Sequence, residues 1–469
     1  MGRKGKRTKG IEEAHPFAGM SQVNKDAAGV DIGAVEIVAC VGGKNSTQIV
    51  KGFGNYTVDL QSIGNWLKEH NVKTVAMEST GVYWIPLFEV LESMGFKCLL
   101  ISSRSLRRVP GRKSDIEDAQ WIQTLHSYGL LESSFRPQAD LVALRTMLRH
   151  RGQLLEHRAP HIQHMQKALL QMNVQLSQAL SDVMGETGQS MIRAIVNGER
   201  SPQLLAAFRD PGCKKSEEEI GKALTGTWRE EHLFVLKQSL ELYDFYTQQL
   251  EACDKEIDRV YTTIRPDWEM GELPAIPKKK QSTHSKNAPK SAREIRQHLK
   301  RINGVDLSLV DGFGISLAQT VTMEVGSNVS EKFPTEKNFC SWLGLAPKHE
   351  ISGGRVLKNK TLKTKNRAGQ AFRMAAQSAK NSDTVFGGMY KRFRARQGPS
   401  QATVSIAHAT PALHPQRGAS VARVVYRMLK YQVEYETISV NEYEKKYEEQ
   451  QVKYFKKKAA KLGYQLVPV

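Results

Sequence analysis

The chain has 469 residues, of which 68 are Lys or Arg and 48 are Asp or Glu, so its net charge is +20. This excess argues against an ordinary metabolic enzyme and favours a polyanionic partner, most often nucleic acid. Hydrophobic residues make up 40% of the chain, enough for folded cores, which excludes a wholly disordered protein. No apolar run approaches the ~18 residues that a membrane helix needs, so no membrane partner is expected.

The cysteines indicate the compartment. All five are scattered, and none forms a Cys-x-x-Cys pair. This usage is typical of a reducing environment without a disulfide framework or zinc cluster. The first 27 residues include a cationic start that no apolar stretch follows, so we expect a flexible basic tail rather than a secretory signal. The expected location is the cytoplasm.

Residues 28–137 are predicted to form the first domain, an α/β unit with a mixed sheet. The expected elements are strands 30–33 and 36–41, helix 59–70, strand 72–78, helix 82–94 and strand 97–101. Asp59 is a plausible cap of the first helix. The alternation of short β-branched runs with helices indicates a sheet that is partly parallel. A hairpin followed by such units is the order found in ribonuclease-H and actin-like folds.

Residues 138–270 are predicted to form a helical arm. Apolar positions recur at helical spacing along 141–180 and along 217–264, which favours two long antiparallel helices, a coiled-coil arm, over a packed globule. Pro160 is expected to kink or break the first helix, and 185–211 carries turn residues. An arm of this kind usually carries an oligomer contact.

A basic linker of Pro and Lys residues, 271–291, is expected before a last, mostly helical domain, 292–430. A helical tail, 431–469, completes the chain. The helices expected in these parts are 316–325, 339–345 and 441–461, the last capped by Asn441 and stopped by Gly463.

Acidic residues occur where strands end and where a helix begins. Asp31 lies inside an apolar strand, and Glu78 ends another. Asp115 and Asp118, three residues apart, share one face at the start of a helix. Carboxylates that converge at one sheet edge repel one another unless cations lie between them. Mg²⁺ suits such all-oxygen ligands, and two ions ~4 Å apart stabilise the attacking and leaving oxygens of a phosphodiester displacement.

Each of these acids also fits a structural role or a different binding role. Asp115 and Asp118 would serve equally as helix caps and dipole partners, and Glu78 as a surface strand end. Asp31 also begins an Asp-x-Gly hairpin, the first phosphate-binding element of actin-like ATPases and sugar kinases. That alternative is the weaker one, because the second phosphate loop and the adenosine motif of those proteins are not found in the sequence.

A basic stretch in the last domain surrounds a serine that precedes two glycines. No acid occurs between Glu350 and Asp383, and such a run beside Gly-Gly fits contacts to a phosphate backbone. The expected contacts are Arg355, Lys358, Lys360, Lys363, Lys365 and Arg367. Ser352 is a candidate nucleophile that neighbouring cations or a metal would activate, although a serine before glycine is most often only part of a turn.

The order of these motifs resembles that of the DEDD transposases of bacterial insertion sequences, the recombinases guided by a bridge RNA. The resemblance extends over about 28–430 and rests on Val30–Gly33, Met77–Trp84, Lys113–Ala119, Gly344–Pro347 and Ile351–Gly354. It implies a RuvC-like fold for the first domain, a coiled-coil arm used in dimerisation, and a transposase domain at the C-terminal end. It also implies that Asp31, Glu78, Asp115 and Asp118 are metal ligands and that Ser352 is the catalytic serine.

The activity implied by this resemblance is Mg²⁺-dependent cutting and rejoining of DNA through a covalent phosphoserine link. The carboxylates of one subunit would act with the serine of another, in a dimer or tetramer. A noncoding guide RNA would pair with donor and target DNA, while the basic surface holds both backbones. A hydrolytic RuvC-like nuclease, in which metal-bound water attacks, and a non-enzymatic nucleic-acid scaffold are the alternatives.

Two departures from the family pattern are present. Residues 409–420 contain Pro411, Pro415 and Gly418 where the family usually runs an unbroken helix, so an inserted loop is expected. Pro160 in the arm is the second departure.

Overall fold

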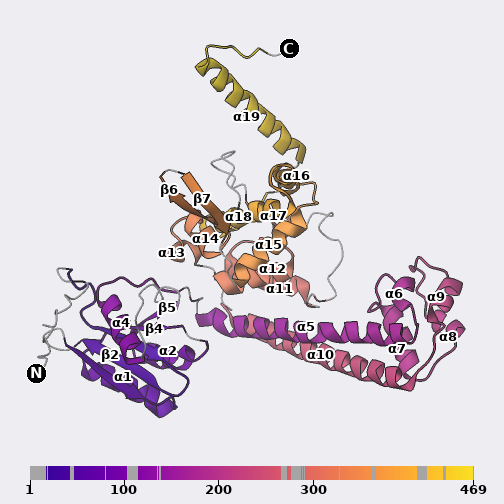
Figure 1. The fold of residues 1–469 in the computed structure, drawn as a ribbon, viewed down its shortest axis with the longest axis horizontal. Helices are drawn as coiled ribbons and strands as arrows, with labels where there is room; N and C mark the ends of the chain where they lie inside the picture. Colours follow the sequence, from indigo (N-terminus) through magenta and orange to yellow (C-terminus); the bar gives the residue numbers. More distant parts are fainter. Residues whose placement is uncertain are drawn as a thin grey trace, which may run out of the picture. The chain divides into compact units, whose positions relative to one another are not determined.

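The computed structural model describes residues 17, 20–42, 47–79, 81–102, 115–134, 136, 139–265, 272–275, 287, 289, 291–326, 328–353, 355–361, 366–408, 420–436 and 440–467. The chain divides into two compact units, Met1–Arg136 and Pro137–Val469 (Figure 1). Within the described ranges, no helix is both long and apolar enough to cross a membrane.

The first unit is built on a five-stranded sheet with the strand order β3-β2-β1-β4-β5. The strands are β1 (Ala27–Ile32), β2 (Ile37–Gly42), β3 (Gln48–Phe53), β4 (Thr74–Glu78) and β5 (Lys97–Ile101). β2 pairs antiparallel with both β1 and β3, whereas β4 pairs parallel with both β1 and β5. The predicted mixed sheet is confirmed, and β3 extends it beyond the strands that the sequence predicts.

Helices cover both faces of this sheet. α1 (Thr57–Glu69) and α2 (Trp84–Ser93) lie on one face, and α4 (Asp115–Ser127) lies on the other. Successive strand residues point to opposite faces, so Val30 and Met77 are buried in the core under α1 and α2, while Cys40 and Ala76 are buried under α4. The same alternation decides which face each acidic residue points to.

Two predicted helix caps are wrong in position. α1 begins at Thr57, and Asp59 is its third residue, where the carboxylate accepts a hydrogen bond of 3.0 Å from the backbone N–H of Tyr56. An acid at this position stabilises the helix start by reaching back to the residue before it. The C-terminal helix α19 (Val440–Lys461) already begins at Val440, so Asn441 lies inside its first turn.

Two long helices form the arm at the start of the second unit. α5 (Ala139–Gln171) pairs with α10 (Glu230–Thr263), and Figure 1 shows them side by side. Arg151 bonds to Asp254, and Arg158 bonds to Thr247, so positions rise along α5 as they fall along α10. The predicted antiparallel pair is confirmed.

Of the predicted kink or break at Pro160, the break is wrong, because α5 runs through this residue. Proline removes one backbone hydrogen bond and crowds the carbonyl four residues earlier. Pro160 is exposed, so water can bond to the carbonyl that is left unpaired, and packing against α10 holds the helix on both sides. Tertiary packing supplies most helix stability in proteins and here outweighs the local preference.

Residues 185–211 carry turns as predicted, but they also form helices. They contain α7 (Glu186–Val196) and α8 (Pro202–Ala206), which lie near α6 (Leu176–Ala179) and α9 (Glu217–Leu224) at the end of the arm. Their apolar side chains share one core with α5 and α10. The second predicted helix is also interrupted, since α9 ends at Leu224 and α10 begins at Glu230.

The remainder of the second unit is mostly helical, as predicted. Its helices are α11 (Ala292–Asn303), the 3₁₀ turn η3 (Leu307–Leu309), α12 (Ile315–Val325), α13 (Val329–Lys332), α14 (Glu336–Trp342), α15 (Arg367–Ala379), α16 (Val385–Gln397), α17 (Pro399–His408), α18 (Val421–Tyr431) and α19. Phe339 lies at the centre of an aromatic core, with ring contacts to Phe333, Phe372 and Tyr426. Residues 409–419 of the expected inserted loop lie outside the described residues.

Candidate active site

Asp31 and Glu78 lie on neighbouring parallel strands. β1 and β4 are in register up to the pair Val30 and Met77, so Asp31 and Glu78 are the next pair along, at the carboxyl ends of both strands. Each lies two residues beyond a residue that faces α4, Gly29 in β1 and Ala76 in β4. Because side chains alternate with a period of two, both carboxylates point to the α4 side of the sheet.

α4 runs antiparallel to these strands. The Ser127 carbonyl at its end accepts a 2.8 Å hydrogen bond from the N–H of Val23, just before β1, and His126 Nε2 lies 2.9 Å from Thr74 Oγ1, at the start of β4. Further along, Gly29 faces the turn from Ala119 to Gln123. Asp31 lies two residues beyond Gly29, which is about 7 Å along the strand. The same distance along an α-helix corresponds to four to five residues, counted back toward the start of α4. Asp31 is therefore level with the first turn of α4.

That first turn carries the other two predicted acids. Asp118 precedes the buried Ala119 and lies one turn before the buried Ile122. Asp31, Glu78 and Asp118 are each half-buried. Asp115 is the first residue of α4, but its side chain lies outside the described residues. Three of the four predicted acids are therefore brought to one end of the sheet.

These acids do not by themselves form a metal cage. Among the side chains that the structure describes, no three from His, Cys, Asp and Glu lie close enough together to hold an ion. The donors nevertheless suit a hard divalent cation, because all are carboxylate oxygens. The positive end of the α4 dipole also favours carboxylates at this place.

Gly29 allows α4 to lie this close to the sheet. A methyl group at this position would lie 2.5 Å from the carbonyl oxygen of Ala119, so any larger residue pushes the helix away. Gly29 is not among the site residues predicted from the sequence. A glycine between apolar strand residues is the available signal, since it often marks close approach of another backbone.

A polar network fixes the position of α4 over the antiparallel strands. Gln48 of β3 donates hydrogen bonds to the Gln120 carbonyl at 2.9 Å and to Gln123 Oε1 at 2.7 Å, and Gln123 donates to Ser127 Oγ at 2.9 Å. Burial, helped by the charge of Lys97, lowers the pKa of His126 to about 4. These side chains have no sequence signal of their own, because polar helix residues are usually solvent-exposed.

Ser352 lies at the tip of a β-hairpin in the second unit. β6 (Pro347–Ser352) pairs antiparallel with β7 (Arg355–Thr361), and Ser352 pairs in register with Arg355 across a two-residue turn. Gly353 has a φ of +55°, and a methyl group added there would meet nothing within 4 Å. Ser352 itself is exposed. The Gly-Gly dipeptide between possible strands is a hairpin signal, which the prediction of a mostly helical domain does not include.

The predicted phosphate contacts lie on and after this hairpin. Arg355, Lys358 and Lys360 belong to β7, but their side chains lie outside the described residues, as do Lys363 and Lys365 entirely. Arg367 is exposed at the start of α15. The contacts remain predictions.

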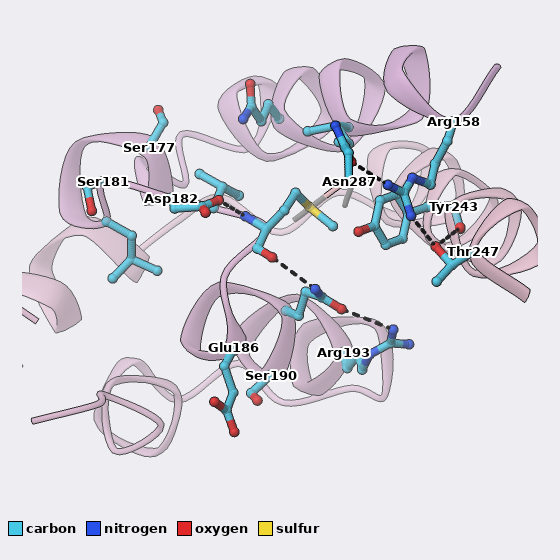
Figure 2. A pocket seen from close by; sticks show the side chains of 16 residues that line it. Arg158, Ser177, Ser181, Asp182, Glu186, Ser190, Arg193, Tyr243, Thr247 and Asn287 are labelled. Carbon is cyan, nitrogen blue, oxygen red and sulfur yellow. Dashed lines mark hydrogen bonds between the residues drawn. The ribbon is translucent and has the colours of Figure 1, made fainter. Parts of the chain in front are cut away.

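A cavity of about 850 Å³ lies in the arm and is lined by none of the predicted site residues (Figure 2). Its two arginines are already bonded: Arg158 donates to Thr247 Oγ1 and Asn287 Oδ1, and Arg193 binds both carboxylate oxygens of Asp244 at 2.6 Å. Acidic side chains line it as well, namely Asp182 and Glu186. Its charges are therefore balanced locally, and it is not a candidate anion site.

Comparisons with known proteins find two family models that match this chain. Residues 28–174 match an IS110-type DEDD family model described as "Transposase", and residues 306–391 match the model "Transposase IS116/IS110/IS902 family". The first range contains all four predicted acids, and the second contains Ser352. No curated protein matches the chain.

Proposed function

We propose a mechanism for this chain, which belongs to the IS110 family of DEDD transposases. Members of this family act on DNA in transposition. The proposal is that the protein cuts and rejoins the DNA strands of an insertion sequence in a Mg²⁺-dependent reaction, through a covalent link to Ser352. The observation that carries it is that Asp31, Glu78 and Asp118 lie at one end of the sheet.

DEDD transposases typically use a divalent metal, and we propose Mg²⁺. Asp31, Glu78, Asp115 and Asp118 would hold it, because hard carboxylate oxygens are the ligands that this ion prefers. When bound, the ion would offset negative charge that develops on the phosphate during displacement. Gly29 and the network around Gln123 position α4, and with it Asp118, relative to Asp31.

Ser352 is the proposed nucleophile. Its Oγ forms a bond to phosphorus while the bond from phosphorus to the leaving strand oxygen breaks. The serine hydroxyl proton passes to the surrounding solvent, and the leaving oxygen takes up a proton from solvent to become a strand hydroxyl. Rejoining is the reverse, in which a strand hydroxyl attacks the phosphoserine and regenerates Ser352. An exposed serine beside Gly353 supports this role, because a turn without a side chain lets a phosphodiester approach closely.

The proposed partners are donor and target DNA, a noncoding guide RNA and further copies of the chain. Base pairing by the RNA would select sequence, and the cationic residues from Arg355 to Arg367 would hold backbones. The acids and Ser352 belong to different compact units. This division is compatible with a site that takes the acids from one subunit and the serine from another, within a dimer or tetramer.

A covalent-adduct assay tests the chemistry. The protein is incubated with its flanking DNA and Mg²⁺ and denatured, and the DNA-linked peptide is identified by mass spectrometry. We expect an adduct on Ser352, no adduct or joining with Ser352→Ala, and no cutting with Asp31→Asn. The exposed Ser341 of α14 provides a matched control, since Ser341→Ala should recombine normally.

Two outcomes would contradict this proposal. Normal recombination by Ser352→Ala would remove the serine from its role. Mg²⁺-dependent cutting with ends free of protein would instead identify a hydrolytic nuclease in which water attacks, with the same carboxylates.

A further inference from the structure

The end of the C-terminal helix takes no part in the chemistry proposed for the acids and Ser352. In the described residues Val452–Val467, every residue except Ala459 is exposed. The preceding turns are held to α16, where the guanidinium of Arg392 lies 3.7 Å from the ring centroid of Tyr447. α19 is the yellow helix in Figure 1. We call residues 452–467 the C-terminal grip.

The grip carries charge of one sign. After Glu449 the chain contains five lysines and no arginine, aspartate or glutamate. These lysines are Lys453, Lys456, Lys457, Lys458 and Lys461. The earlier residues of the same helix, 440–449, contain four glutamates and two lysines, so the net positive charge lies at the end of the helix.

The lysines form a row, with an aromatic ring beside it. Lys453, Lys457 and Lys461 recur every four residues, so they lie on one face of α19 at intervals of about 6 Å along the axis. Tyr454 lies three residues before Lys457 and seven residues before Lys461, so its ring is next to this row. The side chain of Tyr454 is 56% exposed. Phe455 and Tyr464 are 49% and 74% exposed.

We propose that the C-terminal grip binds single-stranded nucleic acid, with the lysine row on the phosphates and Tyr454 stacked on an unpaired base. Exposed aromatic rings beside a cationic row are how proteins bind single strands without reading sequence. A double strand would contact only the lysines, because its bases are already stacked on one another and none is available to Tyr454. A second copy of the grip is disfavoured, since five lysines would face five lysines.

An anionic membrane surface is the competing partner. Val452 and Phe455 lie on the face of α19 away from the lysine row, which gives the helix a narrow apolar stripe. A membrane-bound helix keeps its aromatic rings on that apolar face, as Phe455 does. Tyr454 lies beside the lysines instead, which favours nucleic acid.

The test measures binding of the full chain to fluorescent dT30, rU30 and a 30-bp duplex in EDTA, so that no metal-dependent cutting occurs. The triple variant Lys453→Gln, Lys457→Gln, Lys461→Gln should weaken dT30 and rU30 binding about tenfold at 0.15 M salt. Its plot of log affinity against log salt should be shallower by about 2, since each lost phosphate contact removes about 0.7. Tyr454→Ala should weaken both single strands about fivefold or more and leave duplex binding unchanged.

A charge-matched control uses exposed lysines of the arm, with Lys214→Gln, Lys215→Gln and Lys237→Gln. An equal loss of single-strand affinity in this control would show that the effect comes from the net charge of the protein, and it would overturn the proposal. Unchanged binding and salt dependence in the grip variant would also overturn the proposal, as would an effect of Tyr454→Ala that is equally large on duplex binding.

Loss of binding only to vesicles of phosphatidylglycerol and phosphatidylcholine would show that the grip binds membranes. A stronger loss on dT30 or on rU30 would identify DNA or RNA as the source of the strand. None of these outcomes depends on Ser352 or on the carboxylates, so the proposed function is tested separately.

Discussion

A buried histidine makes the packing of α4 sensitive to pH. His126 is 4% exposed, and burial, with the charge of Lys97, lowers its pKa to about 4. An imidazole in the unfolded chain titrates near 6.5, so between pH 6.5 and 4 the unfolded chain binds more protons. Stability of the first unit is therefore full above pH 6.5 and falls as the pH drops toward 4, by up to about 3 kcal/mol.

His126→Gln should remove most of this pH dependence, because a neutral amide cannot take up a proton in this range. Hydrogen exchange of peptides from β1, β4 and α4, compared at pH 5 and pH 7 after correction for intrinsic rates, measures it. The exposed His150 gives the control variant His150→Gln. The same pH response in His126→Gln and in the unmodified chain would show that another group is responsible.

Glu324 joins the arm to the helical domain. Its carboxylate accepts hydrogen bonds from Arg145 at 2.7 Å and from Arg149 at 2.8 Å, both on α5, while Glu324 is on α12 and is 7% exposed. Burial by itself would raise the pKa of Glu324, but the hydrogen bonds and charges of the two arginines together hold it below 4.5. The stabilisation is present above pH 4.5 and is lost as the pH falls through the lowered value.

Glu324→Gln should destabilise the contact between α5 and α12 by about 3 kcal/mol, because two partly buried arginines lose their counter-charge. Faster hydrogen exchange in both helices at pH 7 would show this loss. Glu331→Gln, an exposed acid on the neighbouring helix α13, is the control and should leave exchange unchanged. Unchanged exchange in Glu324→Gln would mean that apolar packing alone holds the arm.

At the scale of elements, the distance between α4 and β1 decides the geometry of the candidate site. Gly29→Ala would force the helix backbone away from the strand and move Asp118 relative to Asp31. Overpacking of this kind costs about 1–3 kcal/mol, and a shift of about 1 Å at a catalytic group can cost on the order of 100-fold in rate.

We therefore expect Gly29→Ala to lose Mg²⁺-dependent DNA cutting on the order of 100-fold while all four carboxylates remain. Cutting of a labelled flanking-DNA substrate measures the effect. Gly152 of α5 provides the control, because a methyl group there would meet nothing within 4 Å, and Gly152→Ala should cut normally. Full activity of Gly29→Ala would show that the spacing of α4 does not matter to the site.

At the scale of the whole molecule, the acids and the serine occupy different units of the chain. If the active site joins two subunits, Asp31→Asn and Ser352→Ala chains should complement each other. In a randomly mixed dimer, up to about a quarter of the sites would combine intact acids with an intact serine.

Co-expression of the two variants, followed by an assay of strand joining, tests this arrangement. Each variant alone is expected to be inactive, and the mixture is expected to recover joining. No recovery, with mixed oligomers shown to form by affinity tags, would place the acids and the serine of each site in the same chain.

The sequence predicts those helices and strands in which apolar residues recur at regular helical or strand spacing. β4, β5, α2, α12 and the arm pair were all expected near their observed positions. The sequence does not predict β3, because no residue of this strand is fully buried and Gln48 and Lys51 interrupt the apolar run. The β6–β7 hairpin was also missed, since a run of lysines is typical of solvated chain, while only pairing between its strands makes it a sheet.

The net charge, the mixed sheet with a helical remainder and the residue types at the candidate site can all be predicted without a structure. Those properties depend on composition and on periodicity within a few residues. Strand pairing and helix packing are what bring Asp31, Glu78 and Asp118 to the same end of the sheet and place Ser352 at a hairpin tip. Strand register, the direction of α4 and the passage of α5 through Pro160 arise from contacts between residues far apart in the chain, which local preferences do not encode.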